Sequence, residues 1–578
     1  MKILGISAYY HDSAAALLVD GKLVAAASEE RFTRIKHDPD FPRNAIRFCL
    51  ERAGLEPNDL DHIVFYDKPF VKFERILASA VTHFPKSFPQ FMRAMPLWLK
   101  EKLWVPQTIR DELRYQGSIL FSDHHISHAA SAFLCSPFEE AAILTVDGVG
   151  EWATATAGVG RGTEIVLDKE IRFPHSLGLL YSAFTYYLGF KVNSAEYKVM
   201  GLAPYGRPEY EEQFRELIDV KEDGSFRLNM AYFSYDYAMH MTHPRLHELF
   251  GGPPRRPDEP LEQRHKDIAA SLQRVVDDVM VKLANALHKR TGLTRLCMAG
   301  GVALNCVANG HILRETPMKE LFIQPAAGDA GGALGAALYV HNTLLGNPRT
   351  FTFRSPFLGP EYSDEEIESY LKSVGAVYQR LDREPLLEKT VSLIEDQHVV
   401  GWFQGAMEWG PRALGNRSIL GDARNAKMRD TINLKIKFRE GFRPFAPTVL
   451  ADHISEWFEI DCESPYMLLV ANVREDRRTI PSVTHVDHSA RIQSVDREMN
   501  PLYYDLIHKF YEKTGTPVII NTSFNVRGEP IVMTPRHAYE CFMRTDMDDL
   551  IIGPFWLRKE DQPPIPGLVR GDRAFAPD

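Results

Sequence analysis

Residues 2–28 read KILGISAYYHDSAAALLVDGKLVAAAS. Two apolar runs in this stretch are joined by a polar turn that contains His11 and Asp12. The second run ends at Asp20-Gly21, a strong hairpin signal, and a third apolar run follows it. The chain is therefore predicted to open with three strands joined by tight turns.

The same pattern recurs at residues 141–167, which read AAILTVDGVGEWATATAGVGRGTEIVL, with Asp147 in the first turn. Two copies of a strand meander, each followed by helical segments, predict a duplicated α/β subdomain. A nucleotide could lie between the copies, held by their first turns. By analogy of fold alone, this is the layout of actin, the sugar kinases and the Hsp70 ATPases.

A metal site is predicted from residues 123–130, which read DHHISHAA. On a helix, His124 and His128 project from one face about one turn apart, as two ligands of one metal do. Asp147 ends an apolar run, and Asp329 opens a glycine-rich turn. If the fold brings the four together, mixed nitrogen and oxygen ligation suits Fe²⁺, Zn²⁺ or Mn²⁺. The alternatives are core histidines and capping aspartates, and His125 is expected to be structural.

Two strand–glycine–helix units follow one another in the second half of this region. A strand runs into Gly300-Gly301 and then Asn305, and another runs into the turn that contains Gly328. Such turns let phosphate or ribose approach backbone N–H groups, so the pair predicts nucleotide binding.

The chain is predicted to form two domains. Residues 346–362 are rich in Pro, Gly and Thr and are assigned as a linker between domains at 1–345 and 363–560. Ser363 opens a capping-box pattern, which marks the start of a new helix. Residues 561–578 are expected to form a loosely ordered tail.

The second domain places basic side chains beside Gly, Pro and Asn, the residues of tight loops. They are Arg412, Arg417, Lys437, Arg439, Arg491 and Arg527. Arginines clustered in loops suit bidentate binding of phosphate oxygens, and structural ion pairing is the alternative for any one of them.

Residues 70–113 interleave aromatic residues with Lys and Arg. The segment is expected to be an amphipathic helical insertion that packs on the first domain. Two alternatives are an aromatic wall for an acceptor and docking on a membrane surface, which the prolines disfavour.

The bulk properties exclude several classes of protein. A chain of 578 residues needs two or more cores. Its net charge of −10 and lack of a long basic run disfavour nucleic-acid binding. No stretch approaches the roughly 18 apolar residues of a membrane span. The six cysteines form no CxxC pair, so they are expected to be reduced thiols of a cytoplasmic protein.

Several long motifs occur in order along the chain: His11–Ala15, Glu29–His37, Asp123–Ser131, Glu196–Gly206, Gly300–Asn305, Glu408–Gly415 and Asn521–Asn525. With these motifs the chain resembles the O-carbamoyltransferases of the nodulation-factor and antibiotic-biosynthesis type, the NodU/CmcH family. The resemblance runs from about residue 2 to about residue 555.

This resemblance implies an α/β architecture in both domains. The first would be a duplicated actin-like (ASKHA) domain, similar to the transferase that installs threonylcarbamoyl on tRNA adenosine. The second would be YrdC-like, because Lys437-x-Arg439 and Ser523-x-Asn525 look like the signature of YrdC proteins.

The resemblance also implies a reaction in two steps. In the second domain, carbamoyl phosphate and Mg²⁺-bound ATP would give carbamoyl-adenylate, held by the loop cations with Ser523 and Asn525. In the first domain, Fe²⁺ or a similar ion on His124, His128, Asp147 and Asp329 would bind the adenylate. His11 is the candidate base, with Asp12 beside it, and Lys36 would stabilise negative charge. Asn305 would contact the ribose or base.

The acceptor would be a hydroxyl of a small molecule or saccharide, which the sequence does not identify. Two other classes of function stay open. One is a related transferase that acts on tRNA or on a maturation-protein cysteine, disfavoured by the acidic charge and the lack of CxxC motifs. The other is an actin-like nucleotide switch without transferase activity.

Overall fold

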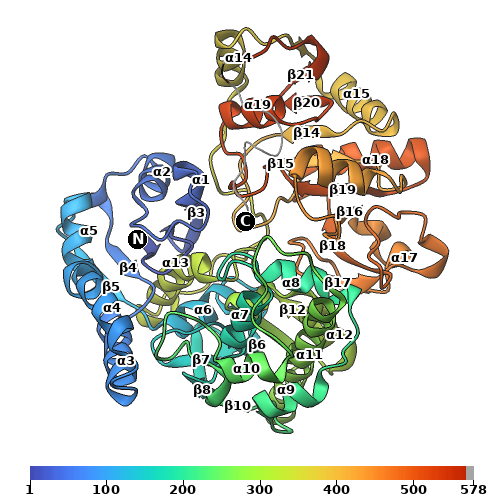
Figure 1. Ribbon diagram of the computed structural model, residues 1–578. Helices are drawn as coiled ribbons and strands as arrows, with labels where there is room; N and C mark the ends of the chain where they lie inside the picture. Colours follow the sequence, from blue (N-terminus) through green and yellow to red (C-terminus); the bar gives the residue numbers. More distant parts are fainter. Residues whose placement is uncertain (566, 568–578) are drawn as a thin grey trace. The chain divides into compact units, whose positions relative to one another are not determined.

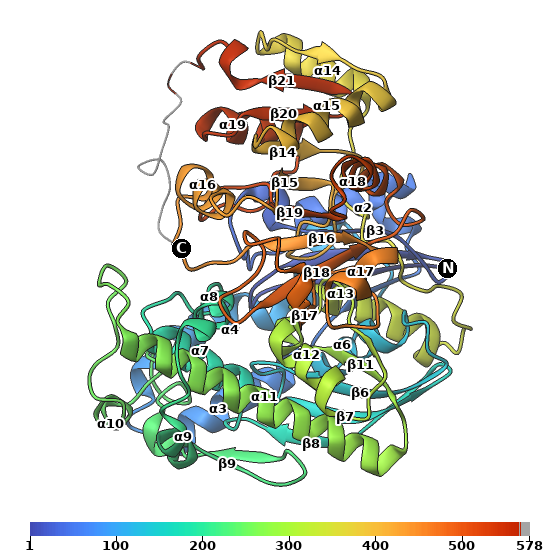
Figure 2. The ribbon, with the colours of Figure 1, turned by 90° about the vertical axis from the view of Figure 1, so that its right-hand side faces the viewer.

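The protein is described by a computed structural model that covers residues 1–565 and 567 (Figure 1, Figure 2). It divides into two compact units. The first unit comprises Met1–Glu29 and His37–Phe353. The second comprises Glu30–Lys36 and the chain from Arg354 onward. Most of the tail predicted for 561–578 lies outside the described residues.

The first unit contains two five-stranded sheets with the same topology. In the first sheet the order is β3-β2-β1-β4-β5, and in the second it is β8-β7-β6-β11-β12. In each, three antiparallel strands are followed by two parallel ones. This repeat confirms the predicted duplicated actin-like α/β fold.

The strands of the first sheet are β1 (Lys2–Ser7), β2 (Ala14–Val19), β3 (Lys22–Ser28), β4 (His62–Phe65) and β5 (Ser118–Phe121). Those of the second are β6 (Glu140–Val146), β7 (Ala153–Arg161), β8 (Glu164–Arg172), β11 (Arg295–Ala299) and β12 (Glu320–Phe322). The first unit also has the hairpin β9 (Ile218–Val220) and β10 (Phe226–Leu228).

Helix α13 (Asp329–Leu338) packs closely on α6 (His124–Phe133) and on β1. Glycines make this approach possible. A Cβ at Gly335 would lie 1.7 Å from the carbonyl oxygen of Ser127, and one at Gly5 would lie 1.8 Å from that of Ala333. These contacts bring the N-terminus of α13 beside α6, where the predicted metal ligands lie.

The insertion after β4 is helical, as predicted. It comprises α3 (Pro69–Thr82), α4 (Phe88–Lys100), the short helix η2 (Lys102–Trp104) and α5 (Val105–Leu113). The other helices of the first unit include α2 (Arg43–Ala53), α7 (Leu177–Tyr187), α8 (Glu196–Leu202), α9 (Glu211–Leu217), α10 (Pro244–Leu249), α11 (Gln263–Thr291) and α12 (Cys306–Glu315). Among the described residues, no helix is long and apolar enough to cross a membrane.

The second unit is built on one mixed sheet of order β13-β21-β20-β14-β15-β19-β16-β18-β17. The strands are β13 (Gln379–Arg380), β14 (Val400–Phe403), β15 (Arg417–Gly421), β16 (Ala446–Leu450), β17 (Leu469–Asn472), β18 (Ser489–Val495), β19 (Val518–Ser523), β20 (Asp549–Ile552) and β21 (Phe555–Arg558). Its helices include α14 (Asp364–Ser373), α15 (Arg383–Glu395), α16 (Met428–Ile432), α17 (Ile454–Trp457), α18 (Pro501–Thr514) and α19 (Pro535–Arg544). Ser363 forms the capping box predicted from the sequence.

Residues Glu30–Lys36, which include α1 (Glu30–Thr33), form a strap that groups with the second unit. Arg34 donates to the carbonyl oxygens of Pro530 at 2.6 Å and Ile531 at 2.7 Å. Arg31 donates to the carbonyl oxygen of Gly410 at 2.9 Å. Phe32 packs on the small apolar cluster Met407, Ala413, Ile531 and Met533.

Candidate metal centre and active site

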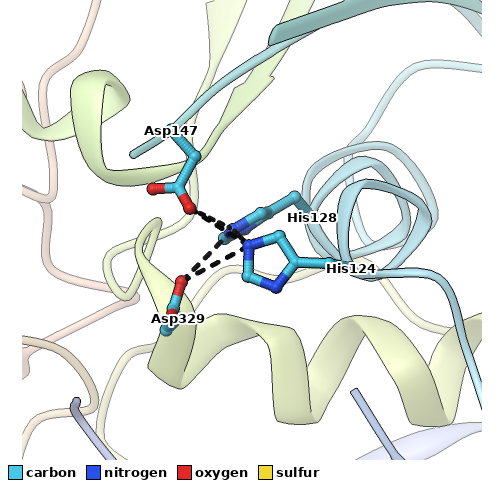
Figure 3. A group of neighbouring side chains, drawn as sticks. All are labelled: His124, His128, Asp147 and Asp329. Atoms are coloured by element: carbon cyan, nitrogen blue, oxygen red, sulfur yellow. Dashed lines mark hydrogen bonds and ion pairs between the residues drawn. The ribbon is translucent and has the colours of Figure 1, made fainter. Parts of the chain in front are cut away.

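Four predicted ligands meet in the first unit (Figure 3). His124 and His128 come from α6, Asp147 follows β6, and Asp329 is the first residue of α13. The two Nε2 atoms lie 3.1 Å apart. Oδ2 of Asp147 lies 3.1 Å from Nε2 of His124, and Oδ1 of Asp329 lies 3.5 Å from Nε2 of His128. All four side chains are buried.

The other two nitrogen–oxygen distances, from His124 to Asp329 and from His128 to Asp147, are 3.7 and 3.8 Å. The set is slightly wider than the spacing of four ligands around one metal ion. Two ligand atoms that each lie about 2.1 Å from an ion, at tetrahedral or octahedral angles, are about 3.0–3.4 Å apart. Among the described residues, Oδ1 of Asp329 accepts no hydrogen bond although it is buried. A buried carboxylate oxygen in that state is strongly unfavourable unless a cation faces it, either a metal ion or a protonated imidazole. The quartet therefore fits a divalent metal with two nitrogen and two oxygen ligands.

The electrostatics of the quartet favour positive charge at its centre. Burial alone lowers the pKa of His128, but the neighbouring carboxylates of Asp147 and Asp329 stabilise its charged form and raise the pKa to about 9. Burial alone raises the pKa of Asp147, but its bonds to His124 and His128 hold it well below its usual range. Protons and a metal ion thus compete for the same buried site.

The surrounding backbone fixes the ligands in place. The other oxygen of Asp147 accepts the Gly301 N–H at 2.8 Å. The Glu151 carboxylate accepts the His124 N–H at 3.0 Å and so caps the start of α6. His125 points away from the quartet. Its two ring nitrogens form hydrogen bonds with the Thr145 hydroxyl and the Ala153 carbonyl oxygen, so its role is structural.

His11 and Asp12 lie in the first turn, as predicted, and a third residue joins them. Nδ1 of His11 lies 3.0 Å from one oxygen of Asp12, and Nδ1 of His37 lies 2.7 Å from the other. Burial lowers the pKa of His11, but the charges of Asp12 and Asp329 outweigh burial and raise it to about 10. Without a metal, His11 is thus an imidazolium at neutral pH. Lys36 ends the strap and directly precedes His37 in the chain.

The sequence interpretation missed a buried cationic group on α3. Lys72 forms a 2.8 Å ion pair with Asp67, and its Nζ lies over the rings of Tyr10 and Tyr66. The Tyr66 hydroxyl donates to Asp329 at 3.4 Å, so this group adjoins the metal quartet. Arg75, one turn further along α3, is also buried. The signal was present, since Lys72 and Arg75 lie three apart on a helix.

The predicted nucleotide turns adjoin the quartet. Gly300 has φ +95°, and a Cβ there would lie 2.2 Å from the Val146 carbonyl oxygen. Asn305 exchanges two 3.1 Å hydrogen bonds with Gln273 of α11. Gly328 directly precedes Asp329 at the N-cap of α13.

Gln273 also donates a hydrogen bond to the carboxylate of Asp277, one turn further along α11. Burial raises the pKa of Asp277 to about 6.

In the second unit, the two predicted tripeptide motifs lie together. Lys437 is buried, and its ammonium donates to the carbonyl oxygen of Ser523 and, at 2.8 Å, to Oδ1 of Asn525. Oγ of Ser523 also donates to Oδ1 of Asn525, at 2.7 Å. Arg439 donates to Asn433 at 2.7 Å and lies over the Phe445 ring.

The structure corrects the expectation that Arg417 binds phosphate. Its side chain is fully buried on β15, with its guanidinium 3.7 Å from the Phe403 ring centroid. The guanidinium donates to four main-chain carbonyl oxygens, those of Pro360, Gln404, Gly405 and Asn416. Arg417 therefore holds loops together. Arg412, Arg491 and Arg527 are only half-buried.

Comparison with known proteins identifies the family. Residues 2–338 match the family model described as the carbamoyltransferase N-terminus, and residues 391–559 match that of the carbamoyltransferase C-terminus. An uncharacterised protein of Synechocystis is 53% identical, with 97% of each chain covered.

Relatives with named roles share less of the sequence. The nodulation protein NolNO of Sinorhizobium fredii is 40% identical over 96% of this chain and 80% of that protein. The 3'-hydroxymethylcephem-O-carbamoyltransferase of Streptomyces clavuligerus is 33% identical over 46% of this chain and 49% of that enzyme. Among solved structures, component A of an Acidaminococcus fermentans dehydratase aligns with 59% of this chain and 97% of that one, with TM-score 0.31 and 16% identity.

Proposed function

Since the chain belongs to the carbamoyltransferase family, we propose that it is an ATP-dependent O-carbamoyltransferase acting on a hydroxyl of a small molecule or saccharide. Carbamoyl phosphate and ATP would first give carbamoyl-adenylate, whose carbamoyl group then passes to the acceptor. The observation that carries the proposal is the family match to both parts of the chain, 2–338 and 391–559. The cephem relative, named for O-carbamoyl transfer, supports the choice of a hydroxyl acceptor.

We assign the activation step to the second unit, with its YrdC-like motifs. Water would cleave carbamoyl phosphate to carbamate and phosphate. A carbamate oxygen then attacks the α-phosphorus of ATP, and pyrophosphate leaves. Lys437 is held in place by Ser523 and Asn525, so its charge is positioned before the anions arrive. Arg439, with Arg412, Arg491 and Arg527, would neutralise the phosphates, and Mg²⁺ would bridge the triphosphate.

We assign the transfer step to the first unit. The acceptor oxygen attacks the carbamoyl carbon, the bond from that carbon to AMP breaks, and AMP leaves. A divalent metal such as Fe²⁺ on His124, His128, Asp147 and Asp329 would supply Lewis-acid polarisation of the adenylate. The turns at Gly300-Gly301 and Gly328, with Asn305, would hold the nucleotide.

The acceptor proton needs a base, and we propose His11. Its Nδ1 is bonded to Asp12, which leaves Nε2 to take the proton. In the metal-free protein His11 is already protonated because Asp12 and Asp329 raise its pKa. A cation on Asp147 and Asp329 offsets part of that charge, which lowers the pKa of His11 toward the range of a base. Lys36 of the strap is the candidate for stabilising the negative charge that develops.

The test is a pyrophosphate-release assay with the full chain, ATP, Mg²⁺, a divalent transition metal and carbamoyl phosphate, with adenylate followed by mass spectrometry. We expect pyrophosphate only when carbamoyl phosphate is present, and its loss in Arg439→Ala. Arg536→Ala, an exposed arginine of α19, is the matched control and should retain the activity. ATP binding without carbamoyl-phosphate-dependent pyrophosphate would contradict the proposal and favour the actin-like nucleotide switch.

A further inference from the structure

The helical insertion of the first unit exposes large apolar side chains on its outer side. Six of them are between 51% and 77% exposed: Val81, Phe84, Phe88, Met92, Leu99 and Trp104. Val81 lies at the end of α3, and Phe84 lies in the turn between α3 and α4 (Figure 1). The next three belong to α4, and Trp104 ends η2. Contiguous exposed apolar side chains on a folded protein mark an interaction surface.

The apolar side chains of α4 form a defined face. Phe88, Met92 and Leu99 are spaced by four and seven residues, so they lie along one side of the helix. Met95 and Trp98, on the adjoining side of the helix, are buried in the unit. The helix is thus apolar inward, where it packs, and apolar outward, where the described residues leave it exposed.

Basic residues border this outer face. Arg93 follows Met92, Lys100 follows Leu99, and Lys86 lies between Phe84 and Phe88; all three are exposed. The stretch Arg75–Lys100 contains no Asp or Glu, although the whole chain has 77 of them and a net charge of −10. The nearest acids outside it, Glu74 and Glu101, flank its two ends. We call Phe84–Lys100, together with Trp104, the basic apolar face.

We propose that the basic apolar face docks peripherally on an anionic lipid surface. Exposed Phe, Met, Leu and Trp side chains bordered by Lys and Arg are the chemistry of a helix that lies in the lipid headgroup region. The prolines, which disfavoured such docking in the sequence, do not break this helix: α4 continues through Pro96. A second copy of the chain fits less well, because a two-fold interface would place the same basic face against itself. An anionic surface attracts this stretch, which has no acidic residue, and repels the rest of the chain, which is acidic. The electrostatic interaction therefore also orients the protein with this face toward the surface.

The test uses the full chain and flotation with phosphatidylcholine vesicles, with and without phosphatidylglycerol. Binding is expected only with phosphatidylglycerol, and it should weaken at high salt. Replacing Lys86, Arg93 and Lys100 by Gln should weaken binding about fivefold per charge removed, since one basic residue near such a surface contributes about 1 kcal/mol. Phe88→Ser with Met92→Ser should abolish binding. Circular dichroism would confirm that each variant is folded.

The matched control removes three exposed charges elsewhere in the first unit, with Lys22→Gln, Lys169→Gln and Lys289→Gln. This variant should bind as the parent does. Equal loss in the control, or equal binding to uncharged vesicles, would overturn the proposal. Failure to bind vesicles of either composition would also overturn it. In that case, a dimer in sedimentation that is lost in Phe88→Ser would show that the face binds a second copy, and capture of an acidic protein would show a protein partner.

Discussion

At the scale of single residues, the proposed metal quartet offers a way to separate the two proposed half-reactions. Replacing His128 by Gln removes one ligand of a buried four-ligand site and leaves the second unit untouched. We expect the bound transition metal and the transfer of carbamoyl to the acceptor to be lost, while carbamoyl-phosphate-dependent pyrophosphate release persists. Metal analysis and product analysis of the same preparation would check this. His240→Gln, an exposed histidine, should change neither quantity.

The raised pKa of His128 predicts an unusual pH dependence for the metal-free protein. Its pKa is about 9 when folded, against about 6.5 when unfolded, so its stabilising charge is fully present below pH 6.5 and lost as the pH rises through 9. We expect the chelated protein to lose stability over that range, by at most about 3 kcal/mol. With metal bound, both histidines are neutral, and binding strengthens as the pH rises.

Thermal unfolding from pH 6.5 to 9, with chelator or with saturating Mn²⁺, would measure this difference. The melting temperature should fall with pH in chelator, and the interval between the two curves should widen. His128→Gln should flatten the chelator curve. A melting temperature that rises with pH in chelator would contradict the assignment of the proton to this site.

Because Arg417 is buried, we expect its substitution to lower the stability of the second unit rather than its binding of phosphate. Arg417→Met leaves four main-chain carbonyl oxygens without their donor, which costs roughly 3–5 kcal/mol because these groups lose their hydrogen bonds to a buried charge. Urea denaturation should show this loss. Arg439→Met is the comparison: it should lower pyrophosphate release and leave the unfolding free energy within about 1 kcal/mol.

The residues differ in how far the sequence could predict their positions. His124 and His128 followed from helical spacing, and Asp147 and Asp329 from strand ends that meet in a duplicated sheet. Arg417 was assigned to phosphate because Gly and Pro surround it, yet β15 turns its side chain into the core. Lys72 was overlooked because its partner Asp67 and its aromatic neighbours come together only in the folded unit.

At the scale of elements, the strap depends on a bidentate contact. Arg34 forks between the carbonyl oxygens of Pro530 and Ile531, a geometry that Lys cannot reproduce. We expect Arg34→Lys to destabilise the second unit by about 1–3 kcal/mol. Hydrogen exchange should show faster exchange in α1 and around Ile531, with the first sheet unchanged. Equal protection in Arg34→Lys and the parent would show that the fork contributes nothing.

The elements themselves were largely predictable, because their signals are local. The two strand meanders, the helical insertion and the capping box at Ser363 follow from periodicity and turn residues. The strap was not predictable. Its contact from Arg31 to Gly410 joins residues 379 positions apart, and nothing in either local sequence indicates the other. The strand order of the second sheet depends on such distant pairings too.

At the scale of the whole molecule, the strap means that the second unit is not one continuous stretch of chain. A fragment from Arg354 to the C-terminus lacks Phe32, which packs on Met407 and Met533 in the intact chain. We expect this fragment to unfold at lower denaturant than the same unit in the full chain. Adding a peptide of residues 29–37 should raise its midpoint, and a peptide with Arg34→Ala should raise it less. No response to either peptide would contradict this prediction.

The tight packing between α13 and α6 has a consequence for which ions the quartet accepts. At Gly335 and Gly5 there is a hydrogen where other residues carry a methyl group, and backbone oxygens occupy that space. Asp329 begins the helix that contains Gly335, so the gap between the carboxylate and the imidazoles is set by how closely the two backbones approach. A single carbon added at Gly335 would meet the backbone of α6 beside His128, push the two helices apart and widen the cage. If the quartet binds a metal ion as proposed, discrimination by ionic radius depends on the smallest residues of the unit as much as on the ligands themselves.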